Sequence, residues 1–266
     1  MSLANAHGVV VVSIDLELDL LERSDWLRQR ALAEITPLLS ELCDTHQISA
    51  TWAVADPAIS AATDVIRGIT VPQEIALLGD ASWIGPAAGP ARFARELSRR
   101  VHHAREAGVA ISSLLLRGAE VGANGEANAE ANWDLLAGHG LNAIRSDLRG
   151  VSTGEPKVAH FGIREFPVNG LLPASGRWWN RYRARRTIRH SIEETARLGG
   201  LFHLAIDTPA MFAAGDRAVS TVQQTFRQIQ KLSSQGRLTV ETLSTATNRL
   251  GRTHSVPPAA SILRAA

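Results

Sequence analysis

Short apolar runs of strand length alternate along this chain with longer stretches in which apolar residues recur at helical spacing. The first run, residues 8–14, is continuously apolar up to Ser13, which is typical of a strand covered on both faces. Ser24 or Asp25 can cap the helix that follows, which carries apolar residues at helical spacing up to Leu42. The same pattern predicts strands at 48–54, 74–78, 109–116, 142–146, 163–168, 201–206 and 238–240, and helices at 91–107, 129–136, 185–198 and 219–232.

This alternation amounts to seven or eight β-α steps with no break in composition between them. Repeated steps of this kind require right-handed crossovers and a mostly parallel sheet. A doubly wound sheet normally begins with a glycine-rich turn after its first strand, whereas here Asp-Leu-Glu follows at residues 15–17. We therefore predict an α/β fold: a distorted (β/α) barrel of about seven parallel strands, formed by residues 1–252 as one domain, with 253–266 as a C-terminal tail.

Composition narrows the class of protein further. With 45% hydrophobic and 20% charged residues and a formal charge of +2, the chain can bury a core and shows no overall bias towards nucleic acid. Cys43 is the only cysteine, so neither an intrachain disulfide nor a cysteine-based zinc site can form. The first residues lack a basic start followed by an apolar run, and Val9–Val12 is too short to span a membrane. We expect a cytoplasmic protein with no membrane partner.

Polar side chains follow most of the predicted strands. Because the loops at the carboxyl ends of parallel barrel strands build the functional site, these residues are candidates for it. They are Asp15 and Glu17, Asp56, Asp80 with Trp83, Arg117, Asp147, Asn169 and Asp207.

The Asp15-Leu16-Glu17 segment is the sharpest of these signals. In an extended chain, residues two apart point to the same side, so both carboxylates can face one cavity. Neighbouring carboxylates push their pKa values apart, which suits one base and one metal ligand. The alternative is an acidic, solvated turn that also includes Asp19 and Glu22.

The segment from Ser13 to Glu17 resembles the first motif of the polysaccharide deacetylases, the NodB-homology superfamily of carbohydrate esterases. Further segments resemble later elements of that family in the same order, and together they extend over roughly residues 9–245: 49–54, 73–79, 116–122, 135–147, 165–169, 175–179 and 202–209. The resemblance implies a barrel in which Asp15 is the catalytic base and Glu17 reaches the metal.

The chain departs from the family at the metal-binding residues. The family's His-x-x-x-His pair falls on Leu78 and Ser82, neither of which can replace an imidazole. The family's catalytic-acid histidine maps to Asp207, and we expect His203 to be a packing residue. Arg117 occupies the position of an arginine in the family's motif, but the proline that usually follows it there is missing.

These departures weaken the case for a cofactor. Zinc keeps Glu17 as its one good ligand, and a site completed by Asp80 would suit Mg²⁺, Ca²⁺ or Mn²⁺ better. We expect no cofactor and a loss of zinc-dependent deacetylation; a divalent metal held by carboxylates is the alternative.

Residues 177–189 combine six arginines with three aromatic residues. Such a segment can contact nucleic acid, grip an acidic or sugar ligand, or form the solvated start of a helix. We expect no nucleic-acid partner. Trp83 and Trp178 could stack on a sugar, whereas Trp52 fits the core equally well.

Three hypotheses follow for the function. In the first, a divergent deacetylase-like protein acts on or binds an acylated carbohydrate or related small molecule, with Asp15 as residual base, Asp207 as acid and Arg117 as the partner that orients Asp15. Arg117, Asp80, Trp83 and Trp178 would contact the ligand. In the second, the barrel is a non-catalytic binding or regulatory scaffold. In the third, Asp15 and Asp207 act as the paired carboxylates of a metal-free hydrolase. The oligomeric state is left open.

Overall fold

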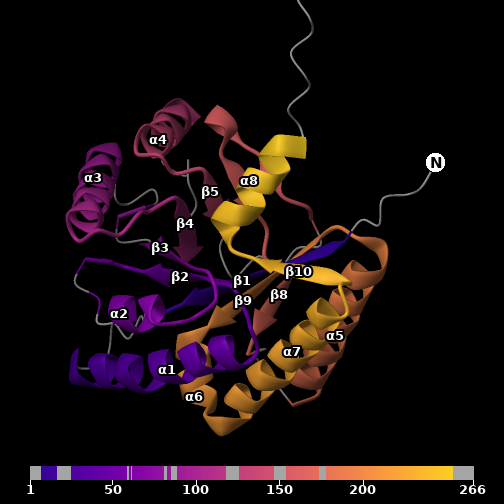
Figure 1. Cartoon of the computed structure of the whole chain (residues 1–266). Coiled ribbons are helices and arrows are strands. Elements are labelled where there is room, and N and C mark those ends of the chain that lie inside the picture. Colours follow the sequence, from indigo (N-terminus) through magenta and orange to yellow (C-terminus); the bar gives the residue numbers. More distant parts are fainter. Residues whose placement is uncertain are drawn as a thin grey trace, which may run out of the picture.

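The computed structural model describes residues 7–16, 25–58, 60, 62–80, 83–84, 89–117, 126–146, 154–173 and 178–253 (Figure 1). The strands are β1 (Gly8–Asp15), β2 (Ala50–Val54), β3 (Gln73–Asp80), β4 (Ser113–Arg117), β5 (Ala143–Arg145), β6 (Lys157–Val158), β7 (Arg164–Phe166), β8 (Gly170–Leu172), β9 (Leu201–Asp207) and β10 (Leu238–Glu241). The helices are α1 (Asp25–Thr45), α2 (Ala62–Arg67), α3 (Pro90–Glu106), α4 (Glu126–Gly138), α5 (Trp178–Leu198), α6 (Thr208–Ala214), α7 (Asp216–Ser234) and α8 (Leu243–Thr253), with a 3₁₀ turn at His160–Gly162.

The strands form one strongly curled sheet, a half-barrel, in the order β6-β7-β5-β4-β3-β2-β1-β9-β8. All neighbouring pairs are parallel except β6 with β7. This architecture confirms the predicted distorted, mostly parallel α/β barrel.

Strand β1 lies at the centre of the sheet, and one of its two edges is divided between two partner strands. Along one side it pairs with β9 from Val9 to Asp15. Along the other side its first half, Gly8–Val11, pairs with β10, and Ser13–Asp15 pairs with β2. Strand β10 is thereby inserted beside β1 (Figure 1).

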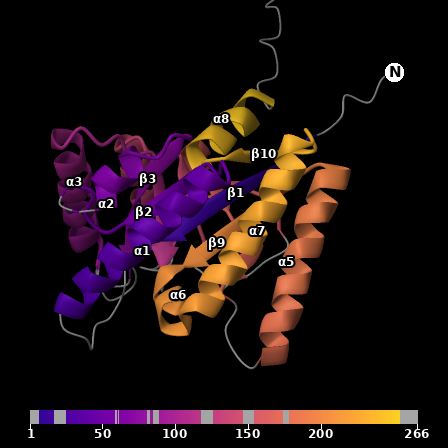
Figure 2. The same cartoon turned by 60° about the horizontal axis from the view of Figure 1, so that its bottom comes forward.

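Side chains alternate along β1 between the two faces of the curled sheet, as the period of two requires. Val10, Val12 and Ile14 belong to the large apolar core that also includes residues of α1, α5 and α7. These helices lie together over one side of the sheet, and α3 and α4 cover the region of β3 to β5 (Figures 1 and 2). The convex face is therefore the helix-covered face.

The concave face holds a smaller apolar core. Val9 and Val11 of β1 meet Leu78 of β3 there, together with Leu243 and Ala246 of α8. Helix α8 therefore closes the half-barrel at the amino-terminal end of the strands, and the opposite end is the one at which a site can form.

A buried carboxylate fastens α8 to the sheet. Glu74 on β3 is 8% exposed and accepts hydrogen bonds from the hydroxyls of Ser112 and Ser113. Its other oxygen accepts from the Thr51 hydroxyl and from the backbone N–H of Ser244, both at 2.9 Å, in the first turn of α8. A carboxylate suits this position because the free N–H groups and the dipole of a helix favour negative charge at its amino-terminal end.

The apolar pattern located the main elements, and the differences have local causes. The strand expected at 109–116 begins at Ser113, because the N–H of Val109 still bonds to Ala104 at the end of α3. Helix α5 begins at Trp178, seven residues before the expected start, and α2, β6, β8, α6 and α8 were not predicted. In the part of the chain that the structure describes, no helix has both the length and the apolar character that a membrane span needs.

Candidate functional site

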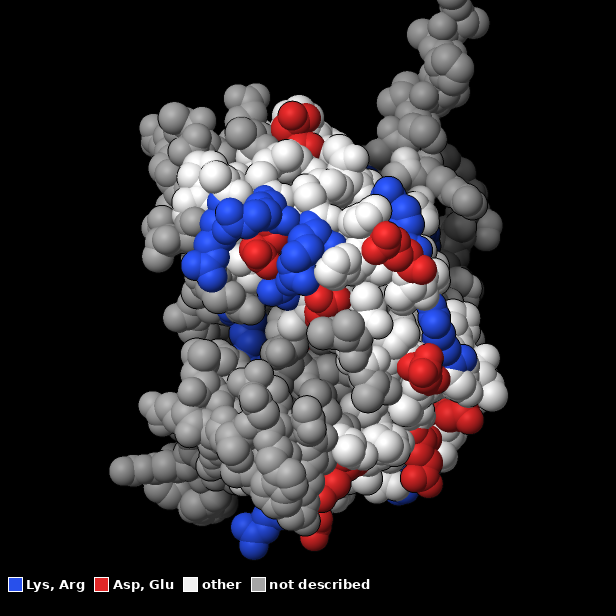
Figure 3. Space-filling view, turned by 90° about the vertical axis from the view of Figure 1, so that its left-hand side faces the viewer, with Lys and Arg blue, Asp and Glu red and all other residues white. Residues whose placement is uncertain are grey.

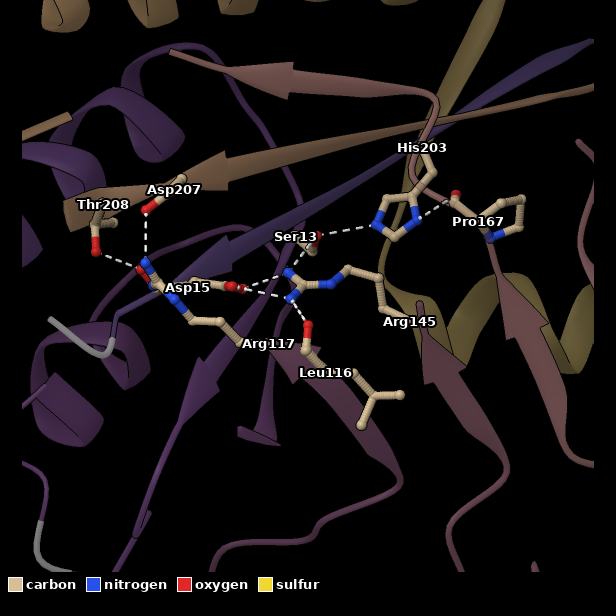
Figure 4. A network of polar contacts seen from close by, with 9 residues as sticks. All are labelled: Ser13, Asp15, Leu116, Arg117, Arg145, Pro167, His203, Asp207 and Thr208. Atoms are coloured by element: carbon tan, nitrogen blue, oxygen red, sulfur yellow. Dashed lines mark hydrogen bonds and ion pairs between the residues drawn. The ribbon is translucent and has the colours of Figure 1, made fainter. Parts of the chain in front are cut away.

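Polar side chains occupy the carboxyl-terminal half of the concave face, above the apolar core (Figure 4). They come from strands that are far apart in the sequence and are brought together by the curl of the sheet: Ser13 and Asp15 from β1, Arg117 from β4, Arg145 from β5, and His203 and Asp207 from β9.

An ion pair between Asp15 and Arg145 lies at the centre of this group. Nη1 of Arg145 contacts Oδ1 of Asp15, and Nη2 donates to Oδ2 at 2.9 Å, so both carboxylate oxygens are held by one guanidinium (Figure 4). Nη2 also donates to the carbonyl of Leu116 at 2.7 Å. Both side chains are 0% exposed. Such fork-to-fork geometry is the strongest arrangement that these two groups can adopt.

Ser13 and His203 lie deeper in the half-barrel. Ser13 comes two residues before Asp15 on β1, and His203 comes two residues before Ala205 on β9. The Ser13 hydroxyl is 2.9 Å from Nε2 of His203, and Nδ1 of His203 is 3.1 Å from the carbonyl oxygen of Pro167. Since a carbonyl can only accept, Nδ1 carries the proton and Nε2 accepts from the hydroxyl of Ser13. His203 therefore joins the polar group as a neutral imidazole.

The surroundings of His203 keep it neutral. Burial, and then the positive charge of Arg145, lower the pKa of His203 to about 3, while the hydrogen bond to Pro167 acts in the opposite direction. The ring also packs edge-on against Phe166, with centroids 6.3 Å apart. The expectation that His203 is a packing residue holds, with the addition that it belongs to the polar network.

Arg117 and Asp207 form a second ion pair nearer the mouth of the half-barrel. Nη2 of Arg117 is 3.3 Å from Oδ1 of Asp207, and each side chain is 20% exposed. Asp207 also caps α6, because its carboxylate accepts from the N–H of Ala210 at 3.2 Å. The hydroxyl of Thr208 donates to the backbone carbonyl of Asp15 and joins the two pairs.

The two ion pairs together define a layered, charge-balanced site. Asp15 and Asp207 are aligned on the neighbouring strands β1 and β9, and each carboxylate has its own guanidinium. The inner pair is fully buried and the outer pair is partly open. Of the four charged side chains in these pairs, Arg117 and Asp207 are therefore the ones accessible to a ligand at the mouth.

The structure brings together three of the residues that the sequence indicated, Asp15, Arg117 and Asp207. It corrects one relation between them. We expected Arg117 to orient Asp15, but Arg145 holds that carboxylate and Arg117 pairs with Asp207. The cause is register: the side chain of Arg145 on β5 enters the concave face at the depth of Asp15, and the side chain of Arg117 lies nearer the mouth.

Trp83 occupies a different place from the expected ligand-contacting rim. Its side chain is 1% exposed and packs in the core beneath α3, stacked on Phe93 with a centroid distance of 6.0 Å. The guanidinium of Arg100 lies 4.9 Å from the centre of the indole ring. The ring is enclosed by these neighbours because it belongs to the outer core, and it offers no open face to a sugar.

The remaining predicted residues are described only in part. The backbone of Asp80 is aligned with that of Arg117 at the ends of β3 and β4, which places it at the mouth, but its side chain lies outside the described part of the structure. Trp178 is the first residue of α5, and its side chain is likewise outside that part. Glu17, Ser82 and Asp147 lie outside the described residues altogether.

The described side chains do not fit a catalytic zinc ion. Leu78, the position where the first family histidine falls, is 1% exposed and packs in the apolar core of the concave face. Both oxygens of Asp15 are bound to Arg145. Among the residues that the structure describes, no three His, Cys, Asp or Glu side chains are grouped so that they could hold a metal.

Sequence reasoning missed Arg145, although one signal pointed to it. An arginine inside a short strand that is otherwise buried needs a buried counter-ion, because an unpaired charge there is very unfavourable. Asp15 at the end of another buried strand is the natural partner, but nothing in the sequence gives the relative depth of β1 and β5.

The curled, mostly parallel sheet is similar in fold to the half-barrel of GH57 domains. Two solved structures illustrate the similarity. The 4-alpha-glucanotransferase from Thermococcus litoralis aligns with a TM-score of 0.61 and 12% identity over 91% of this chain and 40% of its own. The GH57 branching enzyme from Thermococcus kodakaraensis, solved in complex with glucose, aligns with a TM-score of 0.54 and 10% identity over 94% of this chain and 72% of its own.

The chain thus spans two fifths of the length of the glucanotransferase. At these identities the similarity establishes the fold alone. Any statement about chemistry must come from the side chains of this chain. No family model matches the sequence, and no curated protein matches it.

Proposed function

We propose that this chain is a divergent polysaccharide-deacetylase-like protein that binds an acylated carbohydrate or a related small molecule at the Arg117–Asp207 pair, and that it has lost the family's zinc-dependent deacetylation. One observation carries the proposal: among the residues that the structure describes, the outer ion pair of the polar network is partly exposed and the inner pair is not. The side chains of Arg117 and Asp207 are each 20% exposed, whereas Asp15 and Arg145 are 0% exposed.

The chemistry of the outer pair suits such a ligand. The guanidinium of Arg117 can donate to an acyl carbonyl or a sugar hydroxyl, and the carboxylate of Asp207 can accept from a hydroxyl. The pairing between them keeps both side chains in place before a ligand arrives, which limits the entropy lost on binding. The names of the two similar structures, a glucanotransferase and a branching enzyme with glucose, make carbohydrate the first class of ligand to test.

The loss of zinc chemistry is supported by the inner side chains. A general base must be within reach of its substrate, and the Asp15 carboxylate is 0% exposed in its ion pair with Arg145. With Leu78 in place of a histidine, the concave face supplies an apolar group where the family's mechanism needs an imidazole.

A metal-free hydrolase is the second candidate, favoured by the alignment of Asp15 with Asp207 on adjacent strands. Neighbouring strands lie about 4.8 Å apart, and retaining glycosidases hold their two carboxyl groups about 5–5.5 Å apart. This reaction would require Asp15 to leave Arg145. Binding without turnover is therefore the proposal that needs the smaller change in the structure.

The test is calorimetric binding of N-acetylated chito-oligosaccharides and O-acetylated xylo-oligosaccharides to the full chain. Arg117→Gln removes the charge at the mouth and should weaken binding about tenfold, the scale of a charged hydrogen bond. Arg92→Gln is the matched control, because Arg92 is an exposed arginine on α3, and it should leave binding unchanged.

Three results would overturn parts of this proposal. Absence of binding to every acylated oligosaccharide would refute the ligand class. Equal affinity in Arg117→Gln and the intact protein would refute the site. Release of acetate that is abolished by a chelator, with stoichiometric zinc in freshly purified protein, would show that zinc-dependent deacetylation has been kept.

A further inference from the structure

The first half of α5 carries a dense positive charge. Residues 178–189 contain five arginines and no acidic residue. The opposite face of the helix is apolar, with Ile188 and Ile192 packed in the main core. The four arginines whose side chains the structure describes, Arg183, Arg185, Arg186 and Arg189, are all exposed on this helix.

Two of these arginines are available to a partner. Arg183 and Arg186 are exposed and make no hydrogen bond or ion pair with any described residue. By contrast, Arg185 donates to Gln224 of α7, and Arg189 pairs with Glu193 at 3.2 Å. Residues three apart share one side of a helix, so the guanidiniums of Arg183 and Arg186 face the same way.

An exposed aromatic ring lies beside them. Tyr182 is 62% exposed and is four residues before Arg186, which places it on the same side of α5. The surface formed by Tyr182, Arg183 and Arg186, hereafter the α5 surface, offers two fork-shaped donors and one flat ring.

Helix α3, on another side of the molecule, is also rich in arginine. Unlike the first half of α5, it has acidic side chains that neutralise much of its positive charge. Figure 3 shows the side that carries α3, where Lys and Arg side chains gather around acidic ones. Arg99 of α3 pairs with both Glu96 and Asp56 at 3.2 Å, and Arg100 lies 3.8 Å from Glu96. The acids that neutralise much of the charge on α3 have no counterpart in the first half of α5.

The α5 surface lies at the same end of the half-barrel as the Arg117–Asp207 pair. Strand β8 ends at Leu172, which is aligned with Ile206, the residue before Asp207. Helix α5 begins six residues later, within about 20 Å of that point by chain length. From there it runs back towards the start of β9, so its first half is the part near the mouth (Figure 2).

We infer that the α5 surface binds the anionic groups of an acidic carbohydrate, one that bears carboxylate, sulfate or phosphate. This inference rests on the proposed function and adds to it that the carbohydrate ligand carries anionic groups. Arginine matches the planar geometry of such groups and can hold them by two parallel hydrogen bonds. The ring of Tyr182 would lie against the face of a sugar unit, and the chain would continue towards Arg117.

The test compares polygalacturonate with neutral dextran of similar length by calorimetry on the full chain. Polygalacturonate should bind and dextran should bind at least tenfold more weakly, and raising the salt from about 0.05 M to about 0.3 M should weaken polygalacturonate binding severalfold. The double substitution Arg183→Gln/Arg186→Gln should lower the affinity for polygalacturonate about tenfold.

The matched control is Arg92→Gln/Arg95→Gln, which removes two exposed, unpaired arginines at the same spacing from α3. It should change the affinity less than twofold. An equal loss in both double variants would show a general effect of net charge and would overturn the inference. Both pairs are exposed, so unchanged circular dichroism is expected and confirms that folding is intact.

Two further outcomes would also overturn it. Dextran binding as tightly as polygalacturonate would show that the ligand is not anionic, and binding of acetylated oligosaccharides at Arg117 would then still support the proposed function alone. Tighter binding of a single-stranded oligonucleotide than of polygalacturonate with the same number of charges would identify the α5 surface as a nucleic-acid site.

Discussion

Removal of Arg145 is the sharpest test of the buried network. The substitution Arg145→Met keeps a long side chain in place but leaves the carboxylate of Asp15 fully buried without its counter-ion, and the carbonyl of Leu116 loses a donor. Breaking a buried ion pair from one side typically destabilises a protein by about 3–5 kcal/mol. That is a large share of the roughly 5–15 kcal/mol by which native proteins are stable.

The paired substitution separates the ion pair from the packing around it. In Asp15→Leu/Arg145→Met both charges are absent, and replacement of a buried ion pair by apolar groups of similar volume is often neutral or stabilising. The double variant should therefore be more stable than Arg145→Met, and the coupling energy between the two sites should reach about 2–3 kcal/mol.

Urea unfolding followed by circular dichroism gives the free energies for this cycle. Arg92→Met, the same chemical change at an exposed arginine, should alter the free energy of unfolding by less than about 0.5 kcal/mol. A loss below about 1 kcal/mol in Arg145→Met, or simple additivity in the double variant, would refute the description of a tightly coupled buried pair.

Three further expectations concern stability and reactivity. Because the pKa of His203 is lowered to about 3 in the folded protein, the unfolded chain takes up a proton first as pH falls below about 6.5. The free energy of unfolding should then decrease by up to about 1.4 kcal/mol per pH unit down to about pH 3. In acid unfolding curves, His203→Gln should make this decrease smaller. The control His102→Gln, at an exposed histidine, should leave the decrease unchanged. Burial, and secondarily the charge of Asp44, raise the pKa of the Cys43 thiol, so a thiol reagent should leave the native protein unmodified and react once urea unfolds it; rapid native labelling would contradict this. Glu74→Leu leaves the first turn of α8 without its acceptor and should destabilise the protein by about 2–4 kcal/mol; the readout is faster proteolysis of α8 than in Glu194→Leu, which changes an exposed carboxylate on α5.

The fold could be predicted from the sequence because the central strands of the sheet are buried. Val9–Val12 and Leu114–Leu116 are continuous buried apolar runs, and the buried residues of α3 and α7 recur at helical spacing. Short elements such as α6 escaped prediction because a few residues between a strand and the next helix give no measurable period. The three-residue strand β8 was hidden for the same reason.

The site was only partly accessible because the sequence does not give depth within the barrel. Asp15 and Asp207 were identified as strand-end residues, and the register of β1 and β9 indeed aligns them. Which arginine reaches Asp15 depends on how far β4 and β5 are shifted relative to β1, and that shift arises from the curl of the whole sheet. Trp83 was misplaced because a residue two or three positions beyond a strand can turn outwards into the helix layer, as it does against Phe93.

The divided edge of β1 has a consequence for how the chain reaches its native state. Gly8–Val11 pairs along one edge with Leu238–Glu241, and Val9–Asp15 pairs along the other edge with β9, so β1 is completed by two strands from the far end of the described sequence. Contacts across more than two hundred residues slow folding, because the loop between them must close before the contacts repay its entropy. A nascent chain released short of residue 238 would leave half an edge of its central strand open to pairing with other chains, which makes the carboxyl-terminal segment a built-in safeguard against aggregation.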